Sequence, residues 1–445
     1  MSKTLKIQEY DTITSCVHYQ GEKGYGYLEE RHMQELERFI LEFSGMSGDT
    51  DVLQFLKPGF RRKAGKVITV SNYVGVIQLQ SGLSIEILPK VLMGEDDADF
   101  SQTKKAFLRM LRCLREFEGR SLNFAHLKPS TTNLYEIFIS MFVREARELA
   151  KKGLKSSYLE EESNLSFYKG KLSVSEHIKR NFAHQERFFM RYDEYEVDRP
   201  ENRLIKSTLL KLLKLTGSAE IQREIRQVIT MFEMVKPSDN YQRDFAGVII
   251  DRSTKQYELL IDWAKVFLMN KSFSIFSGST TARALLFPME KVFEAFVAAE
   301  MKKYLIPQGF RVNAQDHKYC LFDEPIKQFA LRPDIVVIKD DGQEIIMDTK
   351  WKRLSPSKAN YGISQADMYQ MYAYAKKYST KDYTPDVWIL YPMSAETQKI
   401  QDLSFDSNDG VNVKVFFIDC ADVECIERLC SNLLEDENRH PFSCS

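Results

Sequence analysis

Two short apolar runs separated by a tight polar turn constrain the fold of this chain more than any other feature of its sequence. The runs are residues 335–338 (IVVI) and 344–348 (EIIMD), and both are typical of strands. Between them, Asp-Asp-Gly at 340–342 is a three-residue loop whose glycine can adopt the left-handed conformation of a bulged hairpin. The pattern therefore predicts an antiparallel hairpin in which Lys339 faces Gln343.

The same hairpin predicts a cluster of charged side chains. Counting back along both strands places Asp334 directly opposite Asp348, with Cβ atoms about 5 Å apart. Lys350 lies two residues after Asp348, so strand alternation puts both on one face. Two carboxylates this close repel each other unless a cation lies between them, and Mg²⁺ prefers oxygen ligands. The cluster predicts metal-activated water, oriented by the lysine; an exposed hairpin with ordinary surface charges is the alternative.

Helices on both sides of the hairpin carry further candidates. A helix beginning at Pro288 has Glu290 and Glu294 one turn apart beside its apolar stripe, so either could reach the site as a metal ligand. After the hairpin, a helix capped by Ser364 places Gln370 and Tyr374 on one face. These two could contact phosphate or a metal-bound water. Solvated glutamates and a Tyr-rich core helix are the corresponding alternatives.

The rest of the chain divides by pattern into β-rich and helical parts. Residues 4–98 are mostly strand-like, with one amphipathic helix near 30–43 and a hairpin or meander over 67–91. Helical periodicity begins after acidic residues 94–99, and a Ser/Thr-rich segment at 272–289 is the second junction. We therefore predict an α+β multidomain protein: a β-rich N-terminal domain over 1–100, a mainly helical connector domain over 101–275 and a C-terminal α/β domain over 276–445.

Charge and hydropathy limit the partners of the chain. Its 62 basic residues nearly cancel 63 acidic ones, so DNA contact requires local patches or a partner. The sequence has no apolar signal region and no run of about 18 apolar residues, so we expect a cytoplasmic protein without membrane spans. One basic, glycine-punctuated loop could bind phosphate or an acidic partner, although a solvated turn is the commoner explanation: Lys57, Arg61, Arg62, Lys63 and Lys66.

With these residues in view, the chain resembles the PD-(D/E)xK nuclease superfamily, and more closely the McrC family of nuclease subunits from McrBC-type, 5-methylcytosine-specific restriction systems. The resemblance covers nearly the whole chain. It rests on VGVIQLQSGLSIEILPKV at 74–91, YKGKLSVSEHI at 168–178 with YDEYEVDRPENRLIKSTL at 192–209, LFPMEKVFEAFV at 286–297, RPDIVV and IIMDTKWK at 332–352, and DMYQMYAYAKKY at 367–378.

The resemblance implies a restriction-endonuclease-like domain over 276–445 and a role for each matching residue. Asp334 matches the first acid, Asp348 the second, Lys350 the lysine and Glu294 the helix carboxylate. Asp348 is shorter than the Glu found in many relatives. The implied Mg²⁺ ligands are the three acids and the backbone carbonyl of Thr349, and the implied helix residues that complete the catalytic set are Gln370 and Tyr374.

The family further implies a separate hexameric AAA+ GTPase ring, McrB, which delivers modified double-stranded DNA, and the absence of a phosphate-binding loop here agrees with this. The basic loop over 57–66 and the β-hairpin after it are then the expected ring-binding surface. Two other functions remain open: a non-catalytic activator that only grips DNA, which should lack the lysine or second acid, and a stand-alone repair nuclease, which should lack a neighbouring GTPase gene.

Overall fold

The computed structural model describes residues 4–43, 55–90, 97–114, 133–269, 282–400 and 403–438, apart from the single residues 185, 253, 325, 340 and 382. The chain packs as two compact units, one formed by residues 135–279 and one by residues 3–134 together with 280–445. The N-terminal and C-terminal ranges that we predicted as separate domains thus share one unit. The predicted boundary at 275 lies outside the described residues.

The N-terminal part of the larger unit contains two small sheets and one helix. The helix, α1 (Glu30–Phe43), confirms the prediction for this segment. The first sheet has the order β1 (Thr4–Gln8), β7 (Ser84–Leu88), β6 (Tyr73–Leu79) and β11 (Ala282–Pro288). The second has the order β3 (Tyr25–Tyr27), β2 (Thr12–Thr14), β5 (Gly65–Val70) and β4 (Leu56–Arg61).

Strand β11 was not predicted, because the Ser/Thr-rich segment at 272–289 looked like a junction. Residues 282–288 instead pair antiparallel with β6, so that Leu286 lies opposite Gly75. Residues 270–281 lie outside the described part of the chain. The pairing explains why the N-terminal and C-terminal ranges form one unit: a strand just before the C-terminal helix completes an N-terminal sheet.

The C-terminal part is a six-stranded mixed sheet with helices on its faces, and the mixed α+β class is as predicted. Helix α10 (Gln365–Tyr378) packs against the central strands, while α9 (Met289–Leu305) packs against β12, β16 and α11 (Cys425–Asn438). The sheet order is β12 (Arg311–Ala314), β15 (Ile335–Ile338), β16 (Glu344–Thr349), β17 (Asp386–Pro392), β19 (Asn412–Ile418) and β18 (Leu403–Asp406). A separate small hairpin comprises β13 (Cys320–Phe322) and β14 (Gln328–Ala330).

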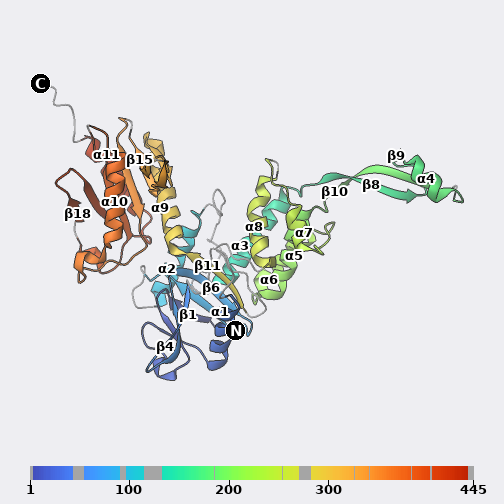
Figure 1. Ribbon diagram of the computed structural model, residues 1–445. Helices are drawn as coiled ribbons and strands as arrows, with labels where there is room; N and C mark the ends of the chain where they lie inside the picture. Colours follow the sequence, from blue (N-terminus) through green and yellow to red (C-terminus); the bar gives the residue numbers. More distant parts are fainter. Residues whose placement is uncertain are drawn as a thin grey trace. The chain divides into compact units, whose positions relative to one another are not determined.

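The second unit is a helical bundle that carries a β-arm (Figure 1). Helix α2 (Asp97–Leu111) belongs to the larger unit; the bundle comprises α3 (Leu134–Lys151), α5 (Pro200–Leu215), α6 (Ala219–Thr230), α7 (Tyr241–Ala246) and α8 (Glu258–Met269). The arm comprises β8 (Ser157–Leu165), β9 (Lys171–Leu172), α4 (Val174–Asn181) and β10 (Phe188–Glu196). No described helix is long and apolar enough to cross a membrane.

The β-arm was not part of the predicted, mainly helical connector. Strands β8 and β10 pair over their full length, from Ser157 opposite Glu196 to Leu165 opposite Phe188. The sequence did not show this, because three consecutive glutamates at 160–162 interrupt the alternation by which strands are recognised.

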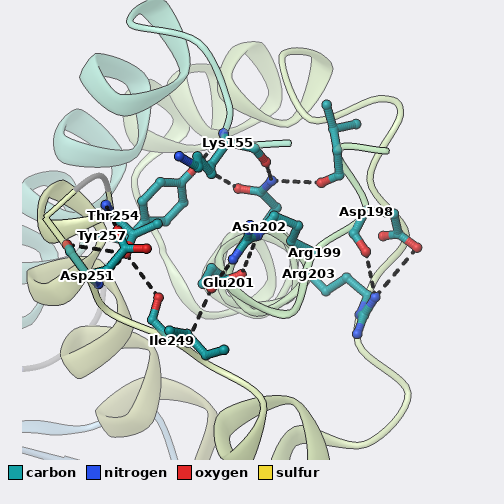
Figure 2. A network of polar contacts seen from close by, with 11 residues as sticks. Lys155, Asp198, Arg199, Glu201, Asn202, Arg203, Ile249, Asp251, Thr254 and Tyr257 are labelled. Carbon is teal, nitrogen blue, oxygen red and sulfur yellow. Dashed lines mark hydrogen bonds and ion pairs between the residues drawn. The ribbon is translucent and has the colours of Figure 1, made fainter. Parts of the chain in front are cut away.

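A buried amide holds both strands of the arm where they leave the bundle (Figure 2). The Asn202 side chain donates to the carbonyl of Lys155 at 3.0 Å, just before β8, and to that of Val197 at 2.7 Å, just after β10. Its oxygen accepts a hydrogen bond of 2.9 Å from the Tyr257 hydroxyl. Because buried amides and carbonyls are costly to leave unpaired, this network fixes the base of the arm.

Candidate active site

The turn between β15 and β16 closes as the sequence predicts. The backbone N–H of Lys339 donates to the carbonyl of Gln343 at 2.9 Å. Gly342 has a φ of +86°, the left-handed conformation that the loop requires. The turn therefore fixes the register of the two strands.

That register brings the two predicted acids together. Ile335 pairs with Met347 in the ladder, and the next position places Asp334 opposite Asp348. Asp348 is 1% exposed and its carboxylate contacts the Lys350 ammonium, as expected for two residues on one face. The predicted convergence of two carboxylates and one ammonium is thus present in the structure.

Each acid has a different set of hydrogen bonds. The Asp334 carboxylate accepts from the Thr349 backbone N–H at 2.7 Å and from the Thr349 hydroxyl at 2.6 Å. For Asp348, the oxygen that touches the Lys350 ammonium accepts no well-directed hydrogen bond from the described residues. Asp334 is therefore held by Thr349 of the neighbouring strand, while the corresponding buried oxygen of Asp348 faces a cation, the Lys350 ammonium.

The pKa shifts of Asp334, Asp348 and Lys350 reflect their burial and their closeness to one another. Burial, together with the negative charge of Asp334, raises the pKa of Asp348, and burial also raises the pKa of Asp334. Burial acts to lower the pKa of Lys350, but the charges of Asp348 and Asp334 outweigh it and the net shift is upward. Lys350 therefore remains an ammonium, and the two acids lie where added positive charge would be stabilising.

Helix α10 places both of its predicted residues at this cluster. Its N-terminal cap is Ser364, whose hydroxyl accepts from the Asp367 N–H at 3.2 Å, confirming the predicted helix start. The Gln370 side chain accepts from the Lys350 ammonium at 3.1 Å and donates to the Tyr374 hydroxyl at 2.7 Å. That hydroxyl lies 3.5 Å from Asp348. Tyr374 also packs in the core, as the alternative interpretation predicted. Its contact with phosphate or a metal-bound water stays a prediction.

Helix α9 separates the two glutamates that the sequence left equivalent. Glu290 accepts from the Asn72 side chain at 2.8 Å. Burial and the charge of Asp334 raise the pKa of Glu294, which lies within electrostatic reach of the cluster. Gln315 bridges Glu294 and Asp334. Its side chain donates to the Glu294 carboxylate at 2.9 Å, and its backbone N–H donates to the Asp334 backbone carbonyl at 2.7 Å. Sequence reasoning missed Gln315, which directly follows β12 and belongs to no recognisable motif.

The donor set suits a hard ion with few protein ligands. No group of three or more His, Cys, Asp or Glu residues in the described part of the chain could hold a metal ion. Mg²⁺, however, often keeps several waters and binds through one or two carboxylates. Asp334 and Asp348 supply these, and the buried Asp348 oxygen without a directed hydrogen bond fits the chemistry of such an ion.

The predicted basic loop is in fact a β-hairpin. Strands β4 and β5 pair from Leu56 opposite Val70 to Arg61 opposite Gly65. Gly65 has a φ of +70°, a conformation that glycine adopts readily at the end of a tight turn. All five of its predicted partner-binding residues are exposed: Lys57, Arg61, Arg62, Lys63 and Lys66. Two of them have partners within the chain. The Arg61 guanidinium donates a hydrogen bond to the Tyr25 hydroxyl at 2.7 Å, and Lys66 forms an ion pair with Glu37 at 3.1 Å.

A buried contact that the sequence did not predict links the end of β1 to the end of the β15–β16 hairpin. Glu9 is 0% exposed and both of its oxygens accept from the Trp351 indole N–H, at 3.0 and 3.1 Å. One oxygen also accepts from the Lys90 N–H at 3.0 Å. Trp351 follows Lys350 directly, so Glu9 supports the strand that carries the cluster.

This carboxyl should make the stability of the larger unit depend on pH. Burial raises the pKa of Glu9 from 4.5 to about 7, so the folded state holds the proton more tightly than the unfolded state. Stability should therefore fall as pH rises from about 4.5 to about 7, by about 3 kcal/mol from this group. Glu9→Gln should remove that part of the fall, as measured by urea unfolding and by amide exchange in β1 and β7. Identical pH dependences in the two proteins would contradict the assignment.

Most of the amino-acid sequence matches the model of a known protein family. The model of the family described as "McrBC 5-methylcytosine restriction system component" matches residues 68–392, well over half of the chain. The chain belongs to this family. The matched range includes the acids, the lysine and α10 of this McrBC-family chain. No curated protein matches it.

Two solved structures share the fold of the McrBC-family chain. A chain of the refined half-complex from a tetradecameric assembly of Thermococcus gammatolerans McrB AAA+ hexamers with bound McrC has a TM-score of 0.72 at 18% identity, with 97% of this chain and 100% of that chain covered. A chain of the Thermococcus gammatolerans McrBC complex has a TM-score of 0.50 at 21% identity, with 68% and 88% covered. At these identities the likeness shows the fold.

Proposed function

We propose that this chain is the endonuclease subunit of a GTP-dependent, modification-dependent restriction complex acting in the cytoplasm. The observation that carries the proposal is the meeting of Asp334, Asp348 and Lys350 at the end of the β15–β16 hairpin. Two acids and a lysine in this arrangement support a PD-(D/E)xK nuclease domain, which hydrolyses phosphodiester bonds. A protein that only grips DNA has no need of this set.

The proposed mechanism assigns a task to each side chain. Lys350, kept protonated by the neighbouring acids, orients the attacking water or stabilises negative charge that develops on the phosphate. Gln370 accepts a hydrogen bond from Lys350 and donates one to Tyr374, and so holds the ammonium in position. Burial excludes bulk water from this cluster, which strengthens each of these interactions.

Mg²⁺ is the proposed cofactor. Asp334, Asp348 and the backbone carbonyl of Thr349 would hold it, with Glu294 as the added carboxylate. When bound, the ion lowers the pKa of a coordinated water and shields the charge of the phosphate. Glu294 would join the two aspartates only if its carboxylate moves toward them, because the described acids do not already form a group of three that could hold an ion.

A hexameric McrB-like AAA+ GTPase ring is the proposed partner, which would deliver modified double-stranded DNA. Family membership supports this, as does the structural likeness to an assembly described as McrB AAA+ hexamers with bound McrC. The exposed basic hairpin of β4 and β5 is one candidate surface for the ring. The tip of the arm is another, because it exposes large apolar side chains, namely Phe167, Tyr168 and Phe182.

Reconstitution tests the proposal directly. The chain is mixed with an McrB-like AAA+ GTPase from the same organism, methylated or unmethylated DNA, GTP and Mg²⁺. We expect cleavage of methylated DNA that requires GTP, Mg²⁺ and both proteins. GTPase stimulation without cleavage would favour the non-catalytic activator, and cleavage independent of the GTPase would favour the stand-alone repair nuclease.

A further inference from the structure

A polar hollow lies directly after the catalytic strand. It begins three residues after Lys350, in the segment that connects β16 to α10. Its volume is about 660 Å³ and it is lined by Arg353, Ser355, Pro356, Ser357, Lys358 and Glu396. Two cationic side chains and two hydroxyls surround a single carboxylate.

The surroundings of that carboxylate are those of a bound anion. The Arg353 guanidinium donates to Glu396 at 2.9 Å. The Ser355 hydroxyl hydrogen bond, followed by the charges of Arg353 and Lys358, lowers the pKa of Glu396. Guanidinium, ammonium and hydroxyl groups are also the donors that proteins use for phosphate oxygens. The Glu396 carboxylate therefore lies where a phosphate would be bound.

The backbone keeps these donors in place. The Ser355 N–H donates to the Tyr361 carbonyl at 2.9 Å, and the Lys358 N–H to the Ser355 carbonyl at 3.1 Å. The turn over Ala359–Gly362 contains Asn360 and Tyr361 with φ of +50° and +58°. A left-handed conformation is costly for a residue as bulky as tyrosine, so it persists only where the surrounding structure fixes it. The hollow is therefore preorganised.

The position of the hollow relates it to the proposed substrate. Three residues span at most about 11 Å of extended chain, so the Arg353 backbone lies within that distance of Lys350. A DNA strand carries one phosphate for about every 3.4 Å along the helix axis. The hollow therefore lies within a few nucleotides of a phosphate bound at Lys350.

We propose that this hollow binds a backbone phosphate of the DNA that is cut, through Arg353, Lys358 and Ser355, with Glu396 released when the phosphate enters. Glu396 is half-exposed and can turn into solvent. The inference rests on the proposed function, because it names where the substrate of that site is held. A phosphodiester in DNA and free phosphate share the required chemistry, and the test separates them.

The test uses the full chain carrying Asp348→Asn, so that DNA is bound and not cut. We expect Arg353→Gln with Lys358→Gln to weaken binding of a 30-base-pair duplex by roughly tenfold or more and to reduce the salt slope by about 1. Glu396→Gln should change the affinity for the duplex in the opposite direction. It should tighten binding roughly threefold or more, because it removes the negative charge that competes with the phosphate.

A matched pair on the same sheet serves as the control. Lys414 and Asp386 form an ion pair of 2.8 Å whose side chains are 36% and 42% exposed, close to the 44% and 43% of Arg353 and Glu396. Asp386 lies at the start of β17 and Lys414 lies on β19. Both are away from the end of β16, which Lys350 follows. Lys414→Gln and Asp386→Asn should change duplex binding less than twofold.

The outcomes separate the inference from the proposed function. If the Arg353, Lys358 and Glu396 variants leave duplex affinity unchanged in the Asp348→Asn background, while the chain with Asp348 intact cuts DNA, the inference alone is overturned. The same result follows if calorimetry shows that inorganic phosphate binds through Arg353 and Lys358 while duplex affinity is unaffected. If the wild-type complex neither binds nor cuts DNA, the proposed function and the inference fail together.

Discussion

Asp348→Asn should reduce DNA cleavage by the reconstituted complex by at least about a thousandfold, and Lys350→Ala should do nearly the same. Asparagine keeps the size of the aspartate but removes its charge, which is the property that a cation requires. It also removes the negative charge that faces the Lys350 ammonium. Cleavage of methylated duplex DNA with saturating GTP and Mg²⁺ is the measurement.

Partner-dependent properties of the same variants should not change. Binding to the GTPase ring and stimulation of its GTPase activity should stay within twofold of wild type, because neither depends on the proposed metal site. Asp341→Asn is the matched control: this aspartate lies in the exposed turn of the same hairpin, and asparagine can still accept from the Gln343 N–H. Full cleavage by purified Asp348→Asn or Lys350→Ala protein would refute the nuclease assignment.

The hairpin was predictable because its information is local. A loop of known length and one glycine with positive φ fix the register, and the register alone brings Asp334 opposite Asp348. The cap at Ser364 is equally local. The positions of Gln370 beside Lys350 and of Glu294 beside Asp334 depend on how helices pack on the sheet, and periodicity could only narrow the choice.

Contacts between distant segments could not be derived in this way. Glu9 and Trp351 are separated by 342 positions, and nothing in either local sequence marks the other. Strand β11 was missed for the same reason, since its partner β6 lies some 200 residues earlier. The arm was missed because the sequence of its strands is rich in polar residues and shows no regular apolar alternation.

Gly75→Ala should destabilise the larger unit by at least about 3 kcal/mol. Gly75 has a φ of +147°, and a Cβ there would lie 2.0 Å from the Leu285 carbonyl oxygen. Because this neighbour is backbone in β11, it cannot move aside without breaking the pairing of β11 with β6. Strand β11 ends at Pro288, immediately before α9, so the damage should extend to the helix that carries Glu294.

Gly82→Ala separates this steric effect from the general cost of replacing a glycine. Gly82 also has a positive φ, +86°, but a Cβ there would meet nothing within 4 Å. Gly82→Ala should therefore lower the free energy of unfolding by only about 1 kcal/mol. Urea unfolding compares the two proteins, and amide exchange in β11 shows whether the pairing is lost in Gly75→Ala alone. Equal destabilisation by the two substitutions, with β11 amides still protected, would mean that the close approach of β6 and β11 is not what holds the N-terminal sheet to α9.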